Sequence, residues 1–133
     1  MGAWGHGSFQ NDDALGFLEE FEDGGLETVE AAFDTVNSLS KGDYLEAPDA
    51  GMALAAAEMV AAVRDGDTSG VPDDAAPALA RHQEALSDPA LLDTARRAVT
   101  RVFQASELKE LWQDTPDWPA WQEVVRNLAS RLR

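Results

Sequence analysis

The chain of 133 residues contains no cysteine. Disulfide bonds and thiolate metal sites are therefore excluded, which is compatible with a reducing compartment. No stretch approaches the roughly 20 consecutive apolar residues that a membrane-spanning helix needs. The start of the chain also lacks the basic region and apolar run that are typical of a secretory signal. From these absences we expect a cytoplasmic protein that does not enter a membrane.

Basic residues are scarce in the first part of the chain. Residues 1–80 carry seventeen acidic residues against only Lys41 and Arg64, whereas residues 81–133 carry eight residues of each sign. The whole net charge of −15 therefore belongs to the first 80 residues. This balance disfavours binding to the phosphates of nucleic acids. It favours association with a basic protein through electrostatic steering, although acidity alone also serves solubility.

Apolar residues recur along the chain with the i, i+3, i+4, i+7 spacing of helices. The spacing and the capping residues predict helices over about 12–23, 26–41, 48–63, 74–86, 89–103, 107–112 and 118–132. No alternating strand pattern, internal repeat or linker is visible. We therefore expect one all-α domain over residues 1–133, a compact bundle of six or seven helices.

The expected helix over 48–63 is unusually thin, because seven alanines fall between positions 50 and 62. Small side chains allow neighbouring helices to approach closely, so we place this helix at the centre of the bundle. Tyr44 and Leu45 of the preceding loop should pack inward, and Leu111 should do so beside Trp112. The tryptophans near the C-terminus are expected to fill the core rather than to line a binding cleft.

The opening stretch MGAWGHGSFQNDDAL contains the first candidate site. Asn11 suits the N-cap of the first helix. Asp12 and Asp13 then lie in the first turn, where the positive end of the macrodipole stabilises their negative charge. His6 lies five residues before Asn11, so a His/Asn/Asp site could form if the arm folds back. Trp4 is expected to bury its ring and hold the glycine-rich arm in an ordered position.

Acidic side chains on the first helix form the second candidate site. Glu19, Glu20 and Glu22 lie outside the apolar stripe of this helix. They are candidate binding residues for a basic protein, and the alternative is that they form an ordinary solvated face.

The loop DGDTSGVPDDAA begins like a calcium-binding loop. Asp65, Asp67, Ser69 and Gly70 stand at positions 1, 3, 5 and 6, but Ala76 replaces the bidentate acid required at position 12. We therefore interpret the segment as a polar connection between helices. Motifs for a nucleophile elbow, a phosphate loop and dinucleotide binding are all missing. We expect no catalytic residue, no metal and no cofactor.

The opening Met-Gly-Ala-Trp-Gly, with Gly7, Phe9, Asn11, Asp12 and Ala14 after it, resembles the start of the bacterial family DUF4259. The alanine-rich ALAAAEMVAA and the terminal SELKELWQD and WQEVVRNLASRL are similar to the middle and end of that family. The resemblance implies a single compact domain. It implies no activity and no catalytic residues, because the family has no assigned function.

Two hypotheses about function remain open. The first is a non-catalytic protein-binding protein, such as an immunity or regulatory factor, whose acidic N-terminal half faces a basic partner. The alternative is a small hydrolase or metal-dependent enzyme with a site at His6, Asn11, Asp12 and Asp13. The missing catalytic motifs favour the first hypothesis.

Overall fold

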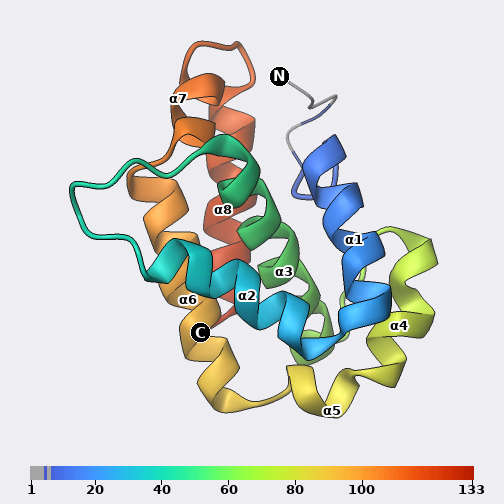
Figure 1. Ribbon diagram of the computed structural model, residues 1–133. Helices are drawn as coiled ribbons and strands as arrows, with labels where there is room; N and C mark the ends of the chain where they lie inside the picture. The colour runs from blue at the N-terminus through green and yellow to red at the C-terminus, as the bar shows by residue number, and fades with distance from the viewer. Residues whose placement is uncertain (1–4, 6) are drawn as a thin grey trace.

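Eight α-helices and one short 3-10 helix make up the part of the chain that the computed structural model describes, residues 5 and 7–133 (Figure 1). The α-helices are α1 (Asp12–Gly24), α2 (Leu26–Asn37), α3 (Ala47–Asp65), α4 (Ala76–Arg81), α5 (Gln83–Leu86), α6 (Pro89–Gln104), α7 (Glu107–Gln113) and α8 (Trp118–Arg131). The 3-10 helix, Asp73–Ala75, precedes α4. The described residues contain no strand, so the prediction of an all-α domain is confirmed.

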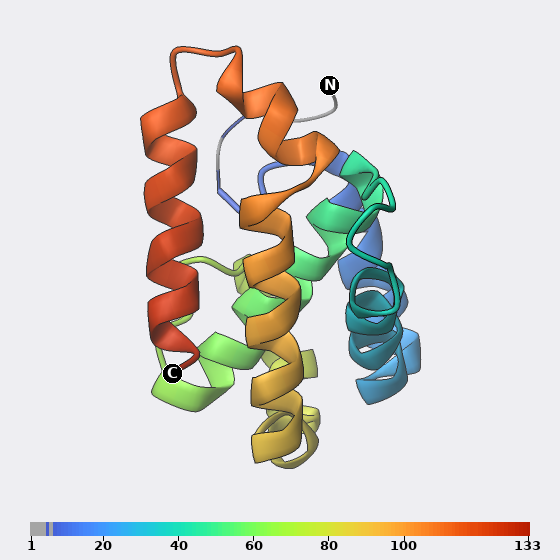
Figure 2. The same ribbon diagram turned by 90° about the vertical axis from the view of Figure 1, so that its left-hand side faces the viewer.

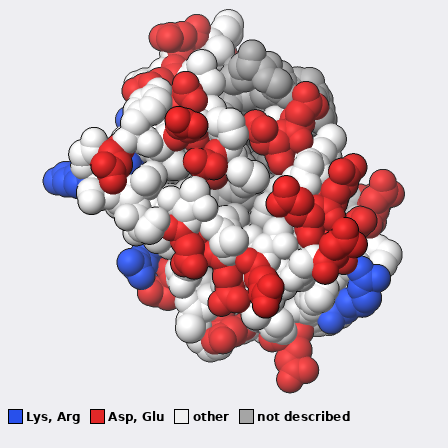
Figure 3. Space-filling view, viewed as in Figure 1, with Lys and Arg blue, Asp and Glu red and all other residues white. Residues whose placement is uncertain are grey.

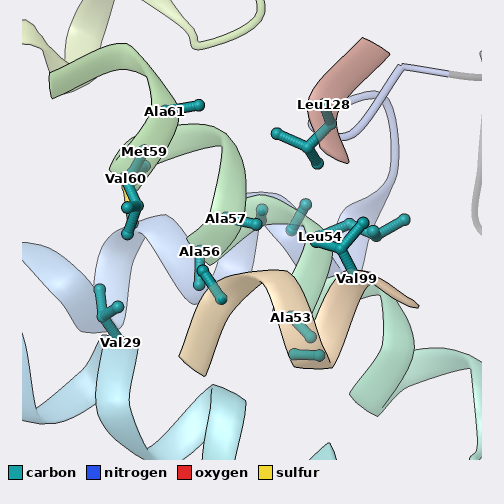
Figure 4. Close-up of a cluster of buried hydrophobic side chains, with 14 of the residues drawn as sticks. Val29, Ala53, Leu54, Ala56, Ala57, Met59, Val60, Ala61, Val99 and Leu128 are labelled. Atoms are coloured by element: carbon teal, nitrogen blue, oxygen red, sulfur yellow. The ribbon is translucent and has the colours of Figure 1, made fainter. Parts of the chain in front are cut away.

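Helix α3 forms the centre of the fold, as its alanine content predicts. Within residues 50–62 only Met52 is not buried. The thin helix contacts α1, α2, α5, α6, α7 and α8. Figure 4 shows Val29 of α2, Val99 of α6 and Leu128 of α8 around the small side chains of α3. Dense packing of this kind stabilises the fold through dispersion and through removal of apolar surface from water.

Helices α6 and α8 run side by side in opposite directions, and α7 joins them at one end (Figure 2). Helix α2 packs against both α3 and α6, and α1 lies against α2 and α3 (Figure 1). Trp121 of α8 is fully buried, and its ring stacks on Trp118 with 5.6 Å between centroids. Trp112 of α7 is also buried. The expectation that these aromatic residues belong to the core is therefore confirmed for Trp112 and Trp121.

Side-chain caps begin three of the helices. The Oδ1 of Asn11 accepts from the backbone N–H of Ala14 at 2.8 Å, as predicted for the start of α1. Asp88 caps α6 and Ser106 caps α7 in the same way. These bonds satisfy backbone donors that have no partner within the helix. Gly25 separates α1 from α2 with a φ of 59°, a conformation that favours glycine.

The expectation of six or seven helices is wrong in one region. The helix predicted over 74–86 is divided into the 3-10 helix, α4 and α5. The division between α4 and α5 falls at His82, whose φ of −108° and ψ of 13° interrupt the helical backbone. The His82 ring there meets the ring of Phe21 edge-on at 5.2 Å, so a contact with α1 accompanies the division. The apolar periodicity of a single helix cannot indicate this contact, because Phe21 and His82 lie far apart in the chain.

Three further expectations need correction. Helix α2 ends at Asn37 rather than near Gly42, because its last buried residue is Val36 and a loop follows. Tyr44 is 57% exposed, and its hydroxyl donates to Glu110 at 2.8 Å instead of packing inward. Leu111 is also exposed, whereas Leu45 is buried as expected. The predicted anchoring of the arm by Trp4 lies outside the described residues.

Candidate functional site

A buried carboxylate lies in the middle of α3. Glu58 is 6% exposed, and it is the one charged side chain among the described residues that is buried. It follows a run of alanines on a helix whose other buried positions are apolar or glycine. A charge in such a place is costly unless it is paired and hydrogen-bonded. The partners of Glu58 therefore indicate what the fold has built around it.

Arg131, near the end of α8, binds Glu58 and the loop that follows α3. Its Nη1 donates to Glu58 Oε1 at 3.0 Å, and its Nε and Nη2 donate to the two carboxylate oxygens of Asp65 at 2.8 and 3.1 Å. Nη2 also donates to the backbone carbonyl of Asp67 at 2.8 Å. A guanidinium is suited to such planar, bidentate binding. The segment that resembles a calcium loop thus holds an arginine side chain.

The surroundings of Glu58 change its acidity. Burial raises the pKa of Glu58 to about 7, although the charge of Arg131 and the hydroxyl of Ser8 act in the opposite direction. Asp67 and Asp65 add smaller repulsive contributions that also raise this pKa. The hydrogen bonds from Arg131 lower the pKa of Asp65 below its usual range. Near neutral pH Glu58 is therefore present in both its protonated and its ionised form, whereas Asp65 stays ionised.

A cleft of about 760 Å³ opens beside this group, between residues 7–10, the loop over 67–72 and α8. We call it the Glu58 cleft. Its apolar wall includes Phe9, Val71 and Val124, and its polar groups include Glu58, Ser8 and Glu123. A volume of this size is typical of sites for small ligands.

Ser8 supplies an unsatisfied hydroxyl to the cleft. The residue is 5% exposed, and its Oγ has no hydrogen-bond partner among the described residues. Gly70 packs against the Glu58 carboxylate so closely that a Cβ on Gly70 would lie 2.5 Å from Oε2. The absence of a side chain at Gly70 thus leaves room for the carboxylate at the wall of the cleft.

The acidic face is a second feature of the surface. We use this name for seven exposed side chains on α1 and α2: Glu19, Glu20, Glu22, Asp23, Glu27, Glu30 and Asp34. Neither helix contains a lysine or an arginine. Figure 3 shows acidic side chains spread over this side of the molecule, with basic side chains toward the margins of the view. The predicted solvated position of Glu19, Glu20 and Glu22 is thus observed.

The N-terminal candidate cluster is only partly within the described residues. Asn11 uses Oδ1 in the α1 cap, and its Nδ2 donates to the carbonyl of Ser8 at 3.3 Å. Asp12 and Asp13 are exposed in the first turn of α1. His6 lies outside the described residues. In the part of the chain that is described, no group of three or more His, Cys, Asp or Glu side chains is arranged to hold a metal ion.

Sequence reasoning did not single out Glu58, Ser8 or Arg131 as site residues. One signal was available, because Glu58 is the sole charged residue within the apolar stretch over 50–63. Its partner Arg131 lies 73 residues later in the chain, so no local pattern could pair them. Arg131 reaches Glu58 through the packing of α8 against α3, and Ser8 reaches it from the segment that precedes α1.

Comparison with known proteins places the chain in a family. A model of the family described as a domain of unknown function (DUF4259) matches residues 2–124. The match covers most of the chain, so the chain belongs to the DUF4259 family. The comparisons with curated proteins and with solved structures gave no match. None of the described helices combines the length and the apolar character needed to span a bilayer.

Proposed function

We propose that this member of the DUF4259 family is a non-catalytic binding protein whose partner is a basic protein. The acidic face carries the proposal. Its seven exposed carboxylates stand on two consecutive helices that contain no basic residue. A field of one sign over such a surface steers an oppositely charged protein and repels nucleic acid. An immunity or regulatory factor would act through a surface of this kind.

The N-terminal cluster gives less support to the alternative of a hydrolase or metal-dependent enzyme. The Asn11 side chain is engaged at both Oδ1 and Nδ2, in the cap of α1 and in the turn before it. Asp12 and Asp13 lie in the first helical turn, where the macrodipole stabilises negative charge without any ligand. Capping therefore accounts for this Asn-Asp-Asp run.

The acidic face should lower the stability of the free protein and speed its association with a basic partner. Like charges repel across the exposed surface, and salt screens this repulsion over a Debye length of about 10 Å at 0.1 M. We expect moderate salt to raise the melting temperature. The triple change of Glu19, Glu20 and Glu22 to Gln should raise it at low salt and should slow association with the partner by about tenfold.

The experiment first isolates a basic protein that the immobilised chain retains at low salt and releases at high salt. Stopped-flow association of that protein is then measured with the triple variant and with a control that changes Asp93, Asp114 and Asp117 to Asn. The control removes the same charge from the electrically balanced part of the chain. Equal association rates for the two variants, or an unchanged rate for the triple variant, would leave the acidic face as a solubility feature only.

A further inference from the structure

The fixed charges of the Glu58 cleft are predominantly negative. Arg131 is the one cationic side chain among the described residues that line the cleft, and this guanidinium is already bound by Glu58, by both oxygens of Asp65 and by the Asp67 carbonyl. Asp65 already compensates the single charge of Arg131, and the described lining adds the carboxyl groups of Glu58, Asp67 and the exposed Glu123. An anionic ligand would therefore meet repulsion, and the described lining offers it no free cation.

Two polar groups in the cleft remain open to a ligand. The Ser8 hydroxyl is buried close enough to Glu58 to lower the pKa of that carboxyl, but it makes no well-aligned hydrogen bond to a described residue, so a bound molecule that supplies one is favoured. Arg131 binds Oε1 of Glu58, and Oε2 accepts no hydrogen bond from the described residues. A hydroxyl and a carboxylate oxygen side by side are suited to a group that carries several N–H donors and a positive charge.

The rest of the cleft is suited to a carbon chain. Phe9 and Val71 are buried side chains of the wall, and Val124 of α8 is half-buried beside them. Removal of aliphatic groups from water against such a wall contributes binding free energy. The volume of about 760 Å³ accommodates a small molecule.

We propose that the Glu58 cleft binds a small organic cation, an aliphatic ammonium compound. Its charged end meets Glu58 Oε2 and the Ser8 hydroxyl, and its carbon chain lies along Phe9, Val71 and Val124. The site is separate from the acidic face on α1 and α2, because its residues belong to the segment 7–10, to α3, to the loop after α3 and to α8. The proposal for the Glu58 cleft can therefore be tested independently of the binding of a basic protein to the acidic face.

The proposal has a consequence for pH. The ammonium group stays charged up to about pH 10, whereas Glu58 has a pKa of about 7 in the free protein. The charged groups that face Glu58 are Arg131 from α8, Asp65 at the end of α3 and Asp67 from the loop after it, and Arg131 and Asp65 remain ionised across this range. Affinity should therefore rise by about tenfold from pH 6 to pH 8, as the Glu58 proton leaves.

The test is isothermal titration calorimetry with n-butylammonium chloride and 1,4-diaminobutane in about 0.15 M salt, which screens diffuse attraction. Sodium butyrate serves as the anionic counterpart. We expect saturable binding of at least one amine and none of butyrate. Glu58→Gln should weaken binding at pH 8 by about tenfold or more and abolish the pH dependence, because a charge-assisted hydrogen bond is lost.

Two further variants separate a specific site from a general effect. Glu19→Gln removes the same charge from the acidic face and should change affinity by less than about twofold, since it is an exposed, screened charge. Ser8→Ala should weaken amine binding by about fivefold, the effect of one ordinary hydrogen bond. At about pH 5, where Glu58 is protonated, the free Ser8→Ala protein should be no less stable than the wild type, because the hydroxyl it loses has no well-formed hydrogen bond.

Several results would overturn the proposal. One is the absence of saturable binding of either amine up to about 10 mM, a concentration beyond any useful small-ligand affinity. Another is an equal loss of affinity in Glu58→Gln and Glu19→Gln. Tighter binding of Nα-acetyl-lysine-N-methylamide than of n-butylammonium would instead assign the cleft to a lysine side chain of a protein. Perturbation of the amide resonances of Ser8, Gly70 and Arg131 by 1,4-diaminobutane would locate the amine in the cleft.

Discussion

Replacement of Glu58 by glutamine should alter how the stability of the protein depends on pH. Glutamine has nearly the same shape as glutamate but carries no charge and does not titrate. Arg131 keeps its paired bonds to Asp65 in the variant, so one ion pair at the site survives. The change therefore tests the ionisation of a buried carboxyl group rather than the packing of α3.

The magnitude follows from the pKa. Burial raises the pKa of Glu58 from 4.5 to about 7. Between these values the folded protein keeps a proton that the unfolded chain has released, so the free energy of unfolding falls as pH rises. One pKa unit corresponds to about 1.4 kcal/mol, so the loss from Glu58 between pH 4 and pH 8 is about 3 kcal/mol. Glu58→Gln lacks this loss.

The assay is urea unfolding of the wild type and Glu58→Gln at several pH values between about 4.5 and 8, with two-state behaviour checked at each. Titration of other groups cancels when the two proteins are compared. The free energy of the wild type relative to the variant should fall by about 3 kcal/mol over this range. Glu19→Gln removes one exposed carboxylate and serves as the matched control for the loss of a negative charge. A constant difference between wild type and Glu58→Gln would refute the burial of an ionisable group at this position.

Two other predictions concern α3 and the loop after it. Ala56→Leu should destabilise the protein by about 1–3 kcal/mol in a urea titration, because Ala56 has no exposed surface and its neighbours leave no room. Ala31→Leu, at an exposed position of α2, is the matched control and should stay within about 0.5 kcal/mol of the wild type. Calorimetry with calcium should show no micromolar binding, because Arg131 occupies both carboxylate oxygens of Asp65; a micromolar affinity would contradict this assignment.

Local patterns predicted most of the fold. Helix caps and apolar stripes involve residues within one or two turns of a helix, so they can be recognised in a short stretch of sequence. The N-caps Asn11, Asp88 and Ser106 are examples. The central position of α3 follows from its alanines, because only small side chains permit several helices to approach one helix. The division at His82 was missed because it coincides with a contact to Phe21, far away in the chain.

The two surface features differ in how they could be recognised. The acidic face follows from sequence, because the apolar stripes of α1 and α2 turn their acids outward whatever else the chain does. The Glu58 cleft does not, because an acid in an apolar helix is compatible with several kinds of partner. Only the fold determines which one approaches. Tyr44 was misplaced for the same reason: its aromatic ring suggested burial, but its partner Glu110 at the surface is known only from the fold.

By itself the sequence therefore determined the helical class, most of the helix starts and buried faces, and the excess of negative charge, since each depends on residues a few positions apart. The tertiary structure decided which side chains meet. It brought Ser8, Glu58 and Arg131 from three distant parts of the chain to one cleft. It also decided the acidity of Glu58, because burial and a neighbouring guanidinium act through space and leave no trace in the order of residues.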